Sequence, residues 1–222
     1  VSSRVGPKVL KQNKIESRYY ALDKHQNTTI SNAAMAAHAI RDAISRSEIS
    51  LDDLQLLVTA TSQGDLPLPG FASMVHGELK NQPCEIASLH GICASSVLAL
   101  RHSVSAVKAG EVSKSAVVAS ELASRLLKAT RFEEQGFGKE KRLPFETEFL
   151  RLMLSDGAGA LLISDQPNST GLSIEVESIH IKSYASQFAP CMYVGKKDNV
   201  SNDEVYGWLD YPGYMEAARD GA

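Results

Sequence analysis

Three short, uninterrupted apolar runs limit the folds that this chain can adopt. They are residues 54–62 (LQLLVTATS), 84–89 (CEIASL) and 114–121 (KSAVVASE). A strand with one face in water alternates apolar and polar residues, whereas a continuous apolar strand is typical of a sheet that is covered on both faces. The sequence therefore predicts three buried strands in a sheet flanked by helices.

Helical patterns lie before and between these strands. Residues 31–46, 71–80 and 93–108 carry apolar residues at spacings of three and four, which indicates amphipathic helices. Thr28 and Thr29 are expected to cap the first of them. Strands that alternate with helices argue for an α/β fold with a largely parallel sheet and helices on both faces.

The remaining segments have weaker patterns. Residues 1–27 are polar and irregular, and residues 124–150 are charged and predict a long surface loop. Residues 149–165 pair two apolar runs around a Ser-Asp-Gly turn. Residues 171–185 alternate polar and apolar side chains, which predicts an antiparallel strand. Residues 190–207 are expected to form a loop.

The DGAGA run at residues 156–160 could be mistaken for a phosphate-binding loop. It lacks both glycine-rich phosphate-binding spacings, and a strand, not a helix, is expected to follow it. We therefore expect Asp156 to shape a turn and the glycines to allow close approach of the backbone.

Composition excludes several classes of partner. The chain has 222 residues, is 43% hydrophobic and has a formal net charge of -3, which suits one large globular domain or two small ones and predicts no nucleic-acid partner. No apolar run is long enough to cross a bilayer, and no secretory signal opens the sequence, so no membrane partner is expected. The first residue is Val, and the last residues suggest a starting helix, so we expect a portion of a longer protein.

The three cysteines are Cys84, Cys93 and Cys191. Their odd number and their spacing favour reduced thiols in a cytoplasmic protein. The six histidines show no metal-ligand spacing, so neither a metal nor another cofactor is predicted. The basic run at residues 139–142 (KEKR) is interpreted as a solvated loop, with docking of an acidic partner as the alternative.

Cys93 has two interpretations from the sequence alone. It follows a predicted strand and opens a predicted helix, where free N–H groups and a partial positive charge stabilise a thiolate. Small neighbours leave room for a substrate there. Alternatively, Cys93 is a small buried hydrophobe, as free cysteines often are. His90 could be a base for Cys93 or merely a packed or exposed side chain, and His180 is expected to be structural.

The stretch EIASLHGICASSVLALRHSVSAVKAGEVSKSAVVASE (residues 85–121) resembles the nucleophile segment of the thiolase-like condensing enzymes. The group that it resembles most is the β-ketoacyl-acyl carrier protein synthase III family. KQNKIESRYYA, LDDLQLLVTATS, LSDGAGALLIS and YPGYMEAARDGA resemble further segments of that family in the same order. The resemblance implies an α/β thiolase-like fold, layered α/β/α/β/α, of which this chain is mainly the N-terminal half. Residues 1–165 are expected to form that half without its first strand, and residues 166–222 to lead into a C-terminal half.

The same resemblance implies a homodimeric acyltransferase. Cys93 matches the nucleophile that accepts an acyl group from acyl-coenzyme A or acyl carrier protein, and its own N–H forms part of the oxyanion hole. The acyl-enzyme then condenses with a malonyl thioester with loss of CO2. Leu68, which precedes Pro69, matches the residue that reaches into the partner subunit's acyl tunnel. The assisting histidine and asparagine are expected beyond Ala222.

Two alternatives remain open at this point. The chain could be a non-catalytic fragment or pseudo-enzyme subunit that dimerises and binds an acyl carrier. It could also belong with the thiolases or polyketide-type synthases, which share the fold and the cysteine, although the short loops and the DGAGA run favour the synthase III group.

Overall fold

A computed structural model of the protein describes residues 6–134 and 145–187 of the chain. The chain divides into two compact units. The larger comprises Tyr19–Arg125 and Ser155–Ile181, and the smaller comprises Val1–Arg18, Leu126–Leu154 and Lys182–Ala222. The elements are α1 (Gly6–Gln12), α2 (Asn32–Ser45), η1 (Leu51–Asp53), β1 (Leu56–Thr61), α3 (Phe71–Leu79), β2 (Glu85–His90), α4 (Ala94–Lys108), β3 (Lys114–Glu121), η2 (Ala123–Arg125), α5 (Ala129–Glu134), α6 (Phe145–Met153) and β4 (Gly157–Ser164), where η marks a short 3-10 helix.

The larger unit is built on a four-stranded sheet in the order β2-β1-β3-β4. Strands β2, β1 and β3 are mutually parallel, and β4 runs antiparallel to β3. All six residues of β1 are buried, as expected for the central parallel strand of a covered sheet. The predicted α/β fold with a largely parallel sheet is confirmed.

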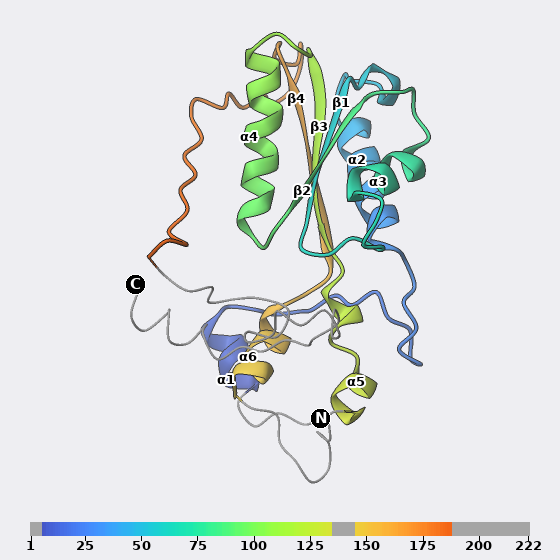
Figure 1. Cartoon of the computed structure of the whole chain (residues 1–222), viewed down its shortest axis with the longest axis vertical. Helices are drawn as coiled ribbons and strands as arrows, with labels where there is room; N and C mark the ends of the chain where they lie inside the picture. Colours follow the sequence, from blue (N-terminus) through green and yellow to red (C-terminus); the bar gives the residue numbers. More distant parts are fainter. Residues whose placement is uncertain (1–5, 135–144, 188–222) are drawn as a thin grey trace. The chain divides into compact units, whose positions relative to one another are not determined.

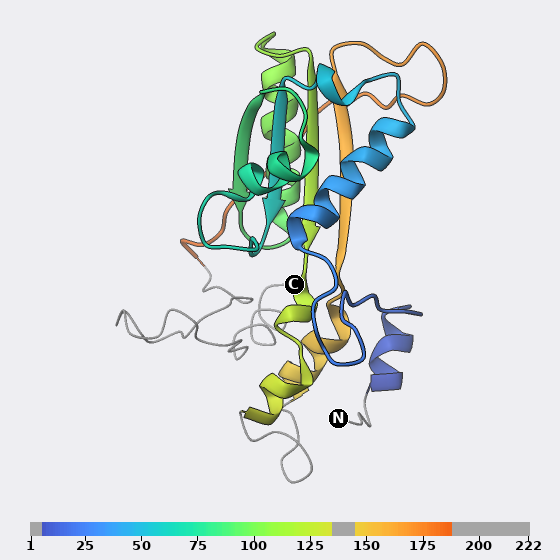
Figure 2. The same ribbon diagram turned by 90° about the vertical axis from the view of Figure 1, so that its right-hand side faces the viewer.

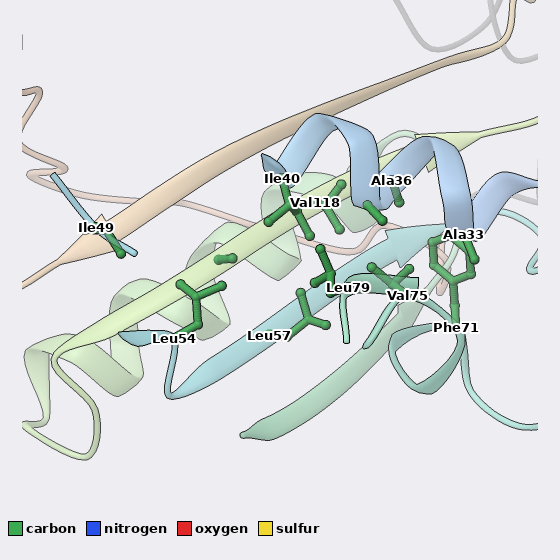
Figure 3. Packing of buried hydrophobic residues seen from close by; sticks show 12 residues of the cluster. Ala33, Ala36, Ile40, Ile49, Leu54, Leu57, Phe71, Val75, Leu79 and Val118 are labelled. Atoms are coloured by element: carbon green, nitrogen blue, oxygen red, sulfur yellow. The ribbon is translucent and has the colours of Figure 1, made fainter. Parts of the chain in front are cut away.

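Helices cover both faces of the sheet. Figure 1 shows α4 on one face and α2 with α3 on the other, and Figure 2 shows the same arrangement from the side. The core between the sheet and α2 and α3, drawn in Figure 3, includes the fully buried side chains of Ile40, Leu57 and Val118. On the opposite face, Ala99 and Ala106 of α4 pack near Val58 of β1. Small residues on α4 let this helix approach the sheet closely.

The first predicted helix forms with a different cap. Ser31, not Thr28 or Thr29, is the N-cap residue of α2, and its hydroxyl accepts a hydrogen bond from the backbone N–H of Ala34 at 3.1 Å. Ser31 is in extended backbone conformation directly before the first helical turn, which is the position where a hydroxyl can reach this N–H. The threonines come too early to do so.

A buried carboxylate joins three chain segments at one end of the sheet. Asp156, at the start of β4, accepts the backbone N–H of Ser124 at 2.7 Å on one oxygen and that of Ala21 at 2.7 Å on the other. The N-terminal segment, the residues after β3 and the start of β4 are therefore joined through one side chain. The expectation that the neighbouring glycines allow close approach is wrong, because a Cβ at Gly157 or Gly159 would meet nothing within 4 Å.

Several segments depart from the sequence-based expectations. Strand β2 was expected to be buried, but Ile86 is 42% exposed, because β2 lies at the edge of the sheet. The irregular segment at residues 1–27 contains α1. The predicted long loop at residues 124–150 contains η2, α5 and α6, and α6 also replaces the first of the two paired apolar runs. Within the smaller unit, α1 contacts α6.

The predicted antiparallel strand at residues 171–185 is also absent. Leu172 and Ile174 are each 82% exposed, so the alternating pattern has no sheet to join within the described residues. Instead, Lys108 Nζ at the end of α4 donates to the backbone carbonyls of Val176 at 3.0 Å and Glu177 at 3.4 Å. The predictions for residues 139–142 and 190–207, for Cys191 and for the last twelve residues lie outside the described residues.

We predict that Asp156→Asn lowers the free energy of unfolding by about 1–3 kcal/mol, because an amide NH2 would face one of the two buried N–H groups and leave it without an acceptor. Urea denaturation of the two proteins measures this difference. The control is Asp165→Asn, an exposed aspartate just after β4, which should change stability by less than about 0.5 kcal/mol. Equal effects of the two substitutions would contradict the role given to Asp156.

Candidate active site

Cys93 lies at the N-cap position of α4, immediately after the turn that follows β2. It is exposed, and its side chain makes no capping hydrogen bond. Within the described part of the chain, its backbone N–H has no hydrogen-bond acceptor. Cys93 therefore stands at the positive, N-terminal end of a 15-residue helix, and the free N–H groups of such a helix end can stabilise negative charge. The interpretation of Cys93 as a buried hydrophobe is wrong.

Serines shape the turn that carries Cys93. Ser95 Oγ donates to the backbone carbonyl of Ile92 at 2.7 Å, and Ser96 Oγ donates to that of Cys93 at 2.8 Å. The N–H of Gly91 donates to the carbonyl of Thr61 in β1 at 3.4 Å. The serine hydroxyls therefore stabilise the turn itself, and the backbone of Gly91 joins the turn to the end of the central strand.

His90 lies three residues before Cys93 at the end of β2. It is the last residue of β2, opposite Thr61 of β1, and it is exposed. No hydrogen bond among the described residues joins its ring to Cys93. His180 is exposed in the segment that forms no strand, and no hydrogen bond among the described residues joins it to Cys93.

Leu68 lies in the loop between β1 and α3, which we call the 62–70 loop. Its side chain is 80% exposed, and the Leu68–Pro69 peptide bond is cis. The loop follows the carboxyl end of β1, and Cys93 follows the carboxyl end of the neighbouring strand β2. Loops at the carboxyl ends of parallel strands share one edge of the sheet, where α/β proteins commonly bind ligands.

Glu121, the last residue of β3, is a member of this edge that the sequence reasoning missed. Its Oε1 accepts the backbone N–H of Ser62 at 2.7 Å and the Ser62 hydroxyl at 2.8 Å. Burial raises the pKa of the Glu121 carboxyl, while Ser62, Arg125 and His90 partly oppose this shift. The sequence did contain a signal for Glu121, since this acidic residue ends the otherwise apolar run at residues 114–121.

Asn32 joins α2 to the same edge. This fully buried residue donates from Nδ2 to Thr61 Oγ1 at 3.0 Å, to the carbonyl of Gln63 at 3.2 Å and to that of Ser120 at 3.4 Å. Its Oδ1 accepts the Ser120 hydroxyl at 2.7 Å. Its own backbone N–H donates to Asp65 Oδ1 at 2.8 Å. A buried amide stabilises the fold when its hydrogen bonds are all made, and it becomes costly when one of its partners is removed.

Asp65 and Arg125 connect the 62–70 loop to α2 and to η2. The second carboxylate oxygen of Asp65 accepts the N–H of Ala33 at 2.8 Å, so Asp65 caps the start of α2 with both oxygens. Arg125 forms an ion pair with Asp65 at 3.4 Å, with side chains only 18% and 22% exposed, and it also donates to the carbonyl of Gln63.

The described residues contain no group of three or more His, Cys, Asp or Glu side chains that could hold a metal ion. In the same part of the chain, no helix is long and apolar enough to span a membrane.

The structure is similar to those of known condensing enzymes. Xanthomonas campestris OleA superposes with a TM-score of 0.57 at 19% identity, and the match covers 72% of this chain and 50% of OleA. AbyA1, a tetronic acid condensing enzyme, gives a TM-score of 0.77 at 18% identity and covers 98% of this chain and 62% of its own. The chain has the thiolase-like α/β fold, as the sequence predicted.

Two curated relatives from different organisms carry the same name. Beta-ketoacyl-acyl-carrier-protein synthase III of Roseobacter denitrificans is 28% identical over 161 residues, which are 72% of this chain and 43% of the relative. The enzyme of that name from Ehrlichia ruminantium is 25% identical over 157 residues, 71% of this chain and 43% of the relative. The resemblance to synthase III is confirmed, and the chain spans less than half the length of these relatives. No family model matches the chain.

We predict opposite pH dependences for two carboxylates. Because the folded pKa of Glu121 is raised, wild-type stability from this group is lost as pH rises through that pKa. The stability of Glu121→Gln relative to wild type should therefore increase between about pH 3 and pH 7. Hydrogen bonds from Ser50 lower the pKa of Asp53, so the relative stability of Asp53→Asn should decrease over the same interval.

Urea denaturation at a series of pH values measures both differences. A negative slope for Glu121→Gln, the sign expected for Asp53→Asn, would show that burial does not dominate the ionisation of Glu121.

Proposed function

We propose that this chain is the nucleophile-bearing part of a condensing acyltransferase in which Cys93 accepts the acyl group. The observation that carries the proposal is an exposed cysteine at the N-terminus of α4, on the fold of the condensing enzymes. The names of the relatives support a synthase III-like reaction.

The first step is thiol–thioester exchange. The Cys93 thiolate attacks the carbonyl carbon of an acyl thioester, and the C–O π electrons move to the oxygen. The backbone N–H of Cys93, which has no other acceptor among the described residues, can donate to that oxyanion, an interaction commonly contributing about 3 kcal/mol per donor. The C–S bond to the donor then breaks, its thiolate leaves and takes a proton, and the acyl group remains on Cys93.

The second step forms the carbon–carbon bond. A malonyl-type thioester loses CO2, and its C–C bonding electrons become the carbanion that attacks the acyl-enzyme carbonyl. The Cys93 thiolate leaves again, so the nucleophile is regenerated. We propose that the histidine and asparagine that assist this step belong to a C-terminal half that follows residues 166–222, while residues 1–165 belong to the N-terminal half.

The proposal includes the partners of the reaction. The donor is acyl-coenzyme A or an acyl carrier protein, and the OleA structures, which include one with bound lauric acid and lauroyl-CoA, support a thioester donor. In a homodimer, the exposed Leu68 reaches into the acyl tunnel of the partner subunit. We place this enzyme in the cytoplasm. A non-catalytic subunit that binds an acyl carrier is the alternative that the following experiment separates.

The intact parent protein should gain the mass of one acyl group when it is incubated with acetyl-, octanoyl- or lauroyl-coenzyme A, and Cys93→Ala should gain none. Intact-mass spectrometry measures the adduct, and the preferred acyl chain identifies the substrate class.

Cys84→Ala is the matched control. Cys84 is half-buried, and burial raises the pKa of its thiol, so less thiolate is available and this variant should be acylated like wild type. Absence of an adduct on the folded wild-type protein would favour the non-catalytic alternative, and an adduct that persists on Cys93→Ala would place the nucleophile elsewhere.

A further inference from the structure

The 62–70 loop is held firmly at its start and at its end but not in the middle. At its start, the Ser62 N–H and hydroxyl both donate to Glu121. At its end, the Ser88 hydroxyl of β2 accepts the N–H of Ala72 at 2.8 Å, and a Cβ at Gly70 would lie only 2.7 Å from that oxygen. Among the described residues, no hydrogen bond holds residues 66–69. Leu68 therefore lies in the middle of a loop whose two ends are fixed.

A partly buried ion pair fixes the first half of the 62–70 loop, at Gln63 and Asp65. Arg125 binds the Asp65 carboxylate and the carbonyl of Gln63 together, which suits the fork geometry of a guanidinium. The same Asp65 carboxylate binds the first two N–H groups of α2. Because both side chains are less than a quarter exposed, solvent screens this pair less than an ordinary surface pair.

These contacts join the loop to elements that the sheet already orients. Arg125 lies in η2, directly after β3, and Asp65 is bonded to the start of α2. The start of the loop, up to Asp65, is thus fixed relative to the edge of the sheet where Cys93 lies, and Leu68 follows Asp65 by three residues. Pro67 and Pro69 restrict the backbone on either side of Leu68.

We propose that Asp65 and Arg125 are positioning residues that set acyl-chain selectivity by fixing the start of the loop that carries Leu68. This inference rests on the proposed function, in which Leu68 lines the partner subunit's acyl tunnel. A displacement of about 1 Å in a group that contacts substrate can change rates by large factors. Loosening the Asp65–Arg125 pair should therefore alter the discrimination between long and short acyl chains.

The experiment compares the rate constants for acylation of Cys93 by octanoyl- and acetyl-coenzyme A in the intact parent protein. Arg125→Met should change the ratio of the two rate constants by at least roughly fivefold. In a Leu68→Ala background, the same Arg125→Met substitution should leave the ratio unchanged, because Arg125 acts through Leu68. Arg125→Lys keeps the charge without the fork and should give a smaller change, and it serves as the test if Arg125→Met does not fold.

The control is Arg46→Met, which removes an arginine whose ion pair with Asp42 is exposed; its ratio should equal that of wild type. A merely structural role for Arg125 predicts that both rate constants fall together with the melting temperature. The inference is overturned if the ratio is unchanged in both Arg125 variants, or if it shifts equally in the Leu68→Ala background. Absence of acylation in wild type would instead overturn the proposed function.

Discussion

The larger unit depends on one buried amide. Asn32 contacts the end of β1, the end of β3 and the loop after β1 with a single side chain, while its backbone N–H donates to the Asp65 carboxylate. Three elements that are distant in the sequence are thereby held in register at the edge of the sheet that carries Cys93. An unsatisfied amide in this position would be costly, so the hydrogen bonds that stabilise the fold also organise the candidate site.

Elements with strong local patterns could be predicted from the sequence. The strands β1 and β3 and the helix α4 were found within about two residues, since their side-chain periodicity follows directly from burial. The exposure of β2 could not be predicted from the sequence, because it depends on which strand lies at the edge of the sheet. The strand predicted at residues 171–185 failed for a related reason, since a strand requires the edge of a neighbouring strand as well as an alternating pattern. Helices α5 and α6 were missed because the charged residues at 124–150 are typical of a surface loop.

Of the residues at the candidate site, the sequence singled out Cys93 and Leu68. Cys93 is recognisable because it stands between a strand and a helix, and the structure adds that it is exposed. Glu121, Asp65 and Arg125 could not be assigned to the site, because their partners are 59, 32 or 33, and 60 residues away in sequence. Such contacts follow from the order of the strands, which brings the carboxyl ends of β1 and β3 together.

Among the described residues, the Asp156 carboxylate binds only backbone N–H groups, those of Ala21 and Ser124. A contact of this kind depends on where the main chain lies and not on which side chains it bears. Evolution can therefore exchange the residues at positions 21 and 124 without losing the junction, with proline as the exception because it has no N–H to donate. The aspartate itself has no such freedom, so variation among related proteins should be distributed unevenly across this one junction.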